Sequence, residues 1–236
     1  MKRFVNMAIV GLGLVVATAA QAGAATILSY DNGWYRNDGL HSGGNTSTFT
    51  GFTAFGGVPF PAAYEHRGFY AFDLTGAPVA SAISITFFAR GSFLTDAGSE
   101  SFSVNDYTGS VASLVAGSTV TNPFGDGAFN DLGAGLLGQY TITGQSGSMP
   151  EITVELSNAF VAQYNAALLA EQKVAVGTAL TSGAYFTAQG VWGGNGLGAG
   201  AARLNITEVA ADVPEPGVLL LVGSGLMALR LRGRRR

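Results

Sequence analysis

Between residues 25 and 212 the chain alternates short apolar stretches with turns rich in glycine, asparagine and aspartate. Residues 66–74, 81–90 and 101–107 alternate or run apolar as buried strands do, and Gly76-Ala77-Pro78 and Asp96-Ala97-Gly98 separate them. Further strands are predicted at 25–30, 139–143, 151–156, 173–179, 184–189 and 202–208. Strand after strand at this spacing predicts a single all-β domain, an antiparallel β-sandwich.

The alternation also predicts which side chains form the core of the sandwich. These are Phe69, Ala71, Ile83, Ile85, Phe87, Phe102 and Val104. Residues 31–61 are rich in glycine, asparagine, serine and threonine, and no strand is predicted there. The large glycine content and the small charged fraction favour many tight turns between short strands.

One helix interrupts the strands. It is predicted to begin after Ser157, whose hydroxyl is suited to capping it. Phe160, Val161, Tyr164 and Leu168 then fall on one face, at the spacing of an amphipathic helix. We expect this helix to close one end of the sandwich.

The N-terminus has the three parts of a secretory signal peptide. Met1, Lys2 and Arg3 precede an apolar run over residues 4–16, and small residues follow. Both Ala20-Gln21-Ala22 and Ala22-Gly23-Ala24 fit the small-x-small cleavage rule, so residues 1–24 are predicted to be removed on export. A retained membrane helix is the alternative, and the run falls short of the roughly 20 residues that span a bilayer.

The C-terminus carries a second targeting pattern. Val213, Pro214, Glu215 and Pro216 are followed by an apolar run over residues 217–229 and then by a basic cluster of Arg230, Arg232, Arg234, Arg235 and Arg236. The prolines hold the peptide extended, and the arginines favour the cytoplasmic side of a membrane. The domain over residues 25–212 is therefore expected to face away from the cytoplasm.

This tail over residues 213–236 resembles the PEP-CTERM sorting signal of Gram-negative bacteria. The resemblance implies a transmembrane sorting helix and a membrane-bound processing enzyme, exosortase, which is thought to cut near the Pro-Glu-Pro motif. The apolar run has about 13 residues before Arg230, shorter than a typical spanning helix. A permanent anchor that is never cut is the alternative reading.

The domain itself resembles a group of PEP-CTERM proteins over residues 30–207. The shared motifs are Gly33-Trp34-Tyr35, then Arg67-Gly68-Phe69-Tyr70-Ala71-Phe72-Asp73-Leu74, then Ser81-Ala82-Ile83. The resemblance implies a jelly-roll-like sandwich and little about chemistry.

Charge and cysteine content narrow the possible partners. Without both terminal signals the chain keeps five basic residues against fifteen acidic ones before Gly217, a net charge near −10. That balance disfavours nucleic acid and anionic lipid surfaces, and it is compatible with neutral glycans, with divalent cations or with simple solubility. The chain has no cysteine, which excludes disulfides, thiolate metal sites and a cysteine nucleophile.

Several patterns could carry chemistry, and for most a structural reading is simpler. Residues 133–138 match a dinucleotide fingerprint, but no strong strand precedes them and a strand is predicted to follow, so no cofactor is expected. His41 and His66 have no ligand-spaced partners and no nucleophile elbow accompanies them. Glu151 and Glu155 would share a strand face, as glycosidase carboxylates could, and as solvated pairs commonly do.

Two sets of residues are candidates for binding. Asp126, Asn130 and Asp131 in a glycine-rich loop, or Asp31, Asn32, Asn37 and Asp38 near the start, offer the oxygen ligands that calcium prefers, although both sets also suit turns. Trp34, Tyr35 and Trp192 would offer flat apolar faces to sugar rings, or would plug the ends of the sandwich.

Three classes of function follow. The family resemblance favours a non-enzymatic envelope or matrix protein, processed by exosortase and associated with exopolysaccharide or biofilm material, which resides in the inner membrane through its tail before cleavage. A carbohydrate-binding, lectin-like module is the second class, and a secreted glycoside hydrolase is the third.

Overall fold

A computed structural model of the chain describes residues 23–42, 47–54, 63–93, 99–116, 127–143, 151–170, 172–182, 189–193 and 201–209. They belong to one compact unit, Gly23–Val209. The predicted signal peptide and the predicted sorting tail lie outside the described residues. Within the part of the chain that is described, no helix has the length and apolar character needed to cross a membrane.

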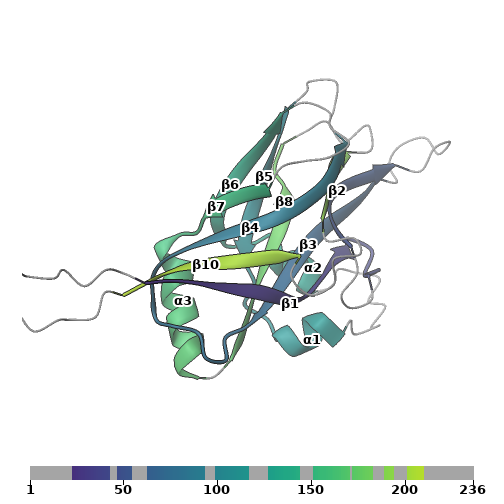
Figure 1. The fold of residues 1–236 in the computed structure, drawn as a ribbon. Helices are drawn as coiled ribbons and strands as arrows, with labels where there is room; N and C mark the ends of the chain where they lie inside the picture. Colours follow the sequence, from purple (N-terminus) through teal and green to yellow (C-terminus); the bar gives the residue numbers. More distant parts are fainter. Residues whose placement is uncertain are drawn as a thin grey trace, which may run out of the picture. The chain divides into compact units, whose positions relative to one another are not determined.

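Strands dominate the described residues, as the sequence predicted (Figure 1). The strands are β1 (Ala24–Arg36), β2 (Thr48–Ala54), β3 (Ala63–Asp73), β4 (Ala80–Phe93), β5 (Ser99–Asp106), β6 (Leu136–Thr143), β7 (Glu151–Glu155), β8 (Lys173–Leu180), β9 (Gln189–Gly193) and β10 (Ala202–Glu208). The helices are α1 (Val111–Ala116), α2 (Gly127–Asp131) and α3 (Asn158–Leu169).

Every strand pairing is antiparallel, and two long strands each belong to two sheets. The first half of β1 pairs with β10, and its second half pairs with β3. The first half of β4 pairs with β10 and β7, and its end pairs with β9. Because β9 pairs with β2 and β2 with β3, the order β1-β10-β4-β9-β2-β3 returns to β1. The sheet is therefore nearly closed, with β8, β5 and β6 extending from β3.

The main core lies between the β10–β4–β7 side and the β3–β8–β5 side of this sheet. Ile83, Ile85 and Phe87 of β4 face Tyr70 and Phe72 of β3 across it, and all five side chains are buried. The rings of Tyr70 and Phe87 stack with their centroids 5.5 Å apart. Helix α3 packs on β4 and β8 and buries Phe160, Val161 and Tyr164 in the same core, so the prediction of one amphipathic helix at this place is confirmed.

All seven side chains predicted to form the core are buried. They do not, however, share one core. Phe69 and Ala71 lie on the other face of β3, in a second cluster that α1 and α2 cover with Leu114 and Phe129. The β3 strand is thus buried on both faces. The sequence did not predict α1 or α2, because helices of six and five residues carry too few positions to show a helical period.

Two further predictions are corrected. The segment 31–61 was expected to lack strands, yet β1 continues through Arg36 and β2 begins at Thr48. Asp31, Asn32 and Gly33 are poor strand formers, and pairing with β3 overrides that preference.

Ser157 occupies the N-cap of α3, but its hydroxyl makes no capping bond. Its backbone carbonyl instead accepts hydrogen bonds from the amides of Phe160 and Val161. Of the strand predicted at 184–189, residues 184–188 lie outside the described residues, and only Gln189 belongs to an observed strand, β9.

Candidate functional site

The three aromatic residues expected to bind glycans occupy different environments. Tyr35 is 2% exposed, and its hydroxyl donates a hydrogen bond of 2.8 Å to the carbonyl of Leu114. Its ring therefore belongs to the core beneath α1. Trp34, one residue earlier, points to the opposite face and is half-buried. Trp192 lies on β9 and pairs in register with Phe49 of β2. The side chain of Trp192 lies outside what the structure describes.

Trp34 belongs to a patch of aromatic and charged side chains at one end of β1 and β3, which we call the Trp34 patch. Its ring meets His66 edge-on, with centroids 4.8 Å apart, and Phe49 meets the same imidazole from 4.9 Å. The Arg36 guanidinium lies 4.0 Å from the centroid of the Tyr64 ring. Because Arg36 pairs in register with His66, these side chains share one face of the sheet.

The charges of the Trp34 patch are largely paired. Arg36 donates from Nε and Nη2 to the two carboxylate oxygens of Asp38, at 2.7 and 2.6 Å. These hydrogen bonds hold the pKa of Asp38 below its usual value. Burial lowers the pKa of His66 to about 4, so its imidazole is neutral at physiological pH. Phe49 and His66 are buried, so the patch presents the half-buried rings of Trp34 and Tyr64. Beside the paired Arg36 and Asp38, these rings suit the faces and hydroxyls of a sugar.

The calcium candidates are not brought together. Asp126 lies outside the described residues, and Asn130 is exposed on α2. The carboxylate of Asp131 accepts hydrogen bonds from the amides of Thr108 and Gly109, at 2.8 and 2.9 Å. These hydrogen bonds connect the turn at Thr108 and Gly109 to the end of α2. Among the described residues no group of three or more metal-ligating side chains occurs.

The second calcium set near the start of the domain is also engaged locally. Asp31 is buried and its carboxylate accepts from the amide of Asn32 at 2.6 Å, while Asp38 is held by Arg36. Asn37 is exposed.

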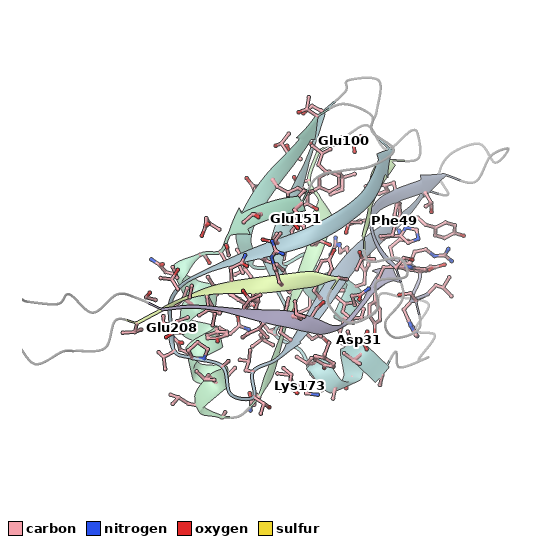
Figure 2. All side chains as sticks on the ribbon, in the orientation of Figure 1. Asp31, Phe49, Glu100, Glu151, Lys173 and Glu208 are labelled. Carbon is pink, nitrogen blue, oxygen red and sulfur yellow. The ribbon has the colours of Figure 1, made fainter. Side chains whose placement is uncertain are left out.

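The two carboxylates considered for glycoside hydrolysis lie on β7, both exposed and on one face, as their spacing predicted. Glu151 forms an ion pair of 2.6 Å with Arg203 of β10. Figure 2 shows Glu151 over the strands of the β10–β4–β7 side. This exposure is that of a solvated pair, which is the simpler reading of their spacing.

The glycine-rich match at 133–138 has a structural role. It leads from a turn after α2 into β6, so no helix N-terminus is available to hold a pyrophosphate. Gly135 has a positive φ of 65°, which glycine adopts without strain. A Cβ on Gly138 would lie 2.6 Å from Val154, so the position serves close strand packing.

The structure also contains a cavity that the sequence did not indicate. It has a volume of about 260 Å³ and lies between α3, the start of β8 and the segment that follows β5. Its polar lining comes from Thr108, Gln163, Gln172 and Lys173, beside the largely buried Tyr107. These residues come from three separate segments of the chain, so no local motif could have identified them.

Lys173 is positioned at the mouth of this cavity, and Figure 2 shows it near the helices at that end of the domain. Its Nζ lies 4.3 Å from the centroid of the Tyr30 ring and 3.7 Å from a carboxylate oxygen of Asp73. The carboxylate of Asp73 therefore offsets the positive charge of Lys173. Amide, hydroxyl and ammonium donors around a cavity of this size match a single hydroxylated ring better than an anion.

The described domain belongs to the class of antiparallel all-β proteins with few helices. Residues 212–236 match the family model of the PEP-CTERM protein-sorting motif. The predicted resemblance of the tail is thereby confirmed, and this motif implies an exported, exosortase-sorted protein. The resemblance predicted for residues 30–207 stays a prediction. No curated protein matches the chain.

Proposed function

We propose that this protein is a non-enzymatic component of the cell envelope or extracellular matrix, released by exosortase and associated with exopolysaccharide or biofilm material. The single observation that carries the proposal is the sorting motif at residues 212–236. An acidic domain supports it, because it stays soluble among neutral polymers and does not adhere to nucleic acid. The jelly-roll-like description of the sandwich belongs to the same proposal and is supported by the Arg67–Leu74 motif, of which Arg67 to Asp73 lie on β3.

The proposed route has an inner-membrane stage. The apolar run over residues 217–229 stops in the membrane, and the arginines from Arg230 to Arg236 stay in the cytoplasm. At 1.5 Å per residue, about 13 residues reach roughly 20 Å, less than the ~30 Å hydrocarbon core. Such a tail suits transient residence better than a permanent anchor, so cleavage close to Pro214–Pro216 completes the route.

The processing step is tested by replacing Pro214-Glu215-Pro216 with alanines in the native host. The expected result is an uncut form that keeps Arg236 and remains in the inner membrane, as in a strain that lacks exosortase. The variant Ala211→Ser is the matched control, because it changes the residue just before the matched segment 212–236 and leaves the motif intact. Intact mass of the released protein is the measurement. Release of the alanine variant at the wild-type rate would contradict the proposal.

A carbohydrate-binding module is the second candidate, and two observations favour it. The Trp34 patch offers an aromatic surface, and the cavity beside Lys173 has uncharged amide and hydroxyl donors. A glycan array probed with the released protein tests this candidate. Saturable binding that Trp34→Ala or Trp192→Ala abolishes assigns it to the aromatic residues, whereas loss with Gln163→Ala alone assigns it to the cavity. Absence of binding to any glycan would leave a passive structural component.

A further inference from the structure

The two ends of the described domain meet at one point. Ala24, at the start of β1, pairs in register with Thr207 near the end of β10. The amide of Glu208 donates a hydrogen bond of 3.0 Å to the carbonyl of Gly23. Figure 2 shows Glu208 at this end of β10, beside the start of β1.

The Glu208 carboxylate lies directly against Gly23. A Cβ built on Gly23 would lie 2.5 Å from Oε2 and 2.9 Å from Oε1 of Glu208. The backbone nitrogen of a residue is about 2.5 Å from its own Cβ, which places the Gly23 nitrogen within roughly 5 Å of Oε2. None of the four ion pairs formed among the described residues uses Glu208.

The sequence leaves two signal-peptidase sites open, one after Ala22 and one after Ala24. Cleavage after Ala24 would remove the Gly23 carbonyl that accepts from Glu208 and the Ala24–Thr207 pair. It would also place a new ammonium on Ala25, which is half-buried against the main core, where a charge loses hydration. Cleavage after Ala22 preserves every one of these contacts.

We infer that the signal peptide is cut between Ala22 and Gly23, and that the new N-terminal ammonium of Gly23 forms an ion pair with the carboxylate of Glu208. Hydrolysis of this amide consumes one water and leaves a carboxylate on Ala22 and an amine on Gly23. The amine is protonated at neutral pH, since an α-amino group has a pKa near 7.7–8.0. Processing thereby places a positive charge beside Glu208, which takes part in none of the four ion pairs among the described residues, and it ties the first strand to the last.

Glycine at position 23 suits both the cleavage and the ion pair. It satisfies the requirement for small residues around the cleavage site. It also leaves the space that the carboxylate of Glu208 occupies, because any larger side chain at position 23 would displace it.

The first test is the N-terminal sequence and intact mass of the protein exported by its native host. A mature chain that begins with Gly23 is the expected result. A chain that begins with Ala25, or that keeps Ala22, would overturn the assignment.

The second test measures the ion pair itself. Two exported forms are compared by thermal unfolding: the wild type, and a form in which two added serines separate the cleavage site from Gly23 and move the ammonium away. Glu208→Gln is introduced into each. It should lower the midpoint of the wild type by roughly 1–3 °C and leave the extended form unchanged, since exposed ion pairs are weak.

The pH dependence supplies an independent readout of the same pair. The difference between wild type and Glu208→Gln should vanish above about pH 9, where the amine is neutral, and shrink at high salt. An equal loss in both forms, or a loss that persists at pH 9, would show that Glu208 acts without the ammonium and would refute the ion pair.

Discussion

Tyr35 and Leu114 are 79 positions apart in the sequence, and the hydroxyl of the first donates a hydrogen bond of 2.8 Å to the carbonyl of the second. Tyr35 is the penultimate residue of β1, and Leu114 packs α1 against the second core. Together with the packing of Leu114 in the second core, this bond holds the short helix α1, which six residues could not stabilise alone.

Tyr35→Phe should therefore lower the free energy of unfolding by about 0.5–1.5 kcal/mol, because the carbonyl of Leu114 loses its partner. Tyr35→Ala should cost about 3–5 kcal/mol through the cavity it leaves. Urea unfolding measures both. Neither variant should alter glycan binding beyond the effect of stability, and a selective loss of binding in Tyr35→Phe would contradict the buried placement of the ring.

Gly177 of β8 is a second place where the outer helices depend on one residue. A Cβ there would collide with the backbone of Leu132, which follows α2. Gly177→Ala should destabilise the domain by about 1–3 kcal/mol, since backbone atoms cannot give way as a flexible side chain can. Gly127→Ala is the matched control, because a Cβ at the first residue of α2 meets nothing within 4 Å. Equal stability of the two variants would show that α2 does not rest on β8.

His66 should make the domain sensitive to mild acid. Its pKa is about 4 in the folded state and near 6.5 in an unfolded chain, so the unfolded chain binds the proton first. Its contribution is therefore complete above pH 6.5 and is lost as the pH falls towards 4, by about 3 kcal/mol in total. Unfolding free energies measured between pH 7 and 4 should show this loss. His66→Gln should flatten the dependence in this range, and His41→Gln should retain it.

The Glu151–Arg203 pair is expected to matter little. Both side chains are partly exposed, so Glu151→Gln should change the unfolding free energy by no more than about 1 kcal/mol, and less in high salt. Thermal unfolding at two salt concentrations measures this. The same variant tests the hydrolase alternative, since turnover of any polysaccharide by the wild type that Glu151→Gln abolishes would overturn the non-enzymatic proposal.

The fold was predictable where side-chain pattern alone determines it. Alternation identified β3, β4 and β5, and all seven predicted core side chains are buried. It failed where tertiary pairing overrides local preference. Asp31, Asn32 and Gly33 form a strand because they pair in register with Ala71, Tyr70 and Phe69 of β3. The division of the predicted core residues among three clusters, with Phe69 and Ala71 in the second and Phe102 in the third, was also beyond reach. A period of two marks a buried strand but does not tell which of its two faces a helix will cover.

The candidate sites show the same limit from another side. The sequence shows which residues are aromatic, but not which face of the sheet each side chain lies on. That face depends on strand register, which places Trp34 on one face and Tyr35 on the other. The cavity beside Lys173 is assembled from residues 107–111, 163–167 and 172–174, so no single local spacing could reveal it. The tail, in contrast, was read correctly because its elements are contiguous and their order is itself the signal.

The position of β10 makes the fold depend on complete synthesis. This strand lies between β1 and β4, so neither has its partner on that side until residues 202–208 have been made. A chain interrupted earlier would expose two long strand edges, which are templates for aggregation and for quality-control proteases. Only three residues separate Val209 from Val213, so a ribosome that has supplied the last strand is about to supply the sorting motif. Incomplete products thus lack their sorting motif and their closing strand together.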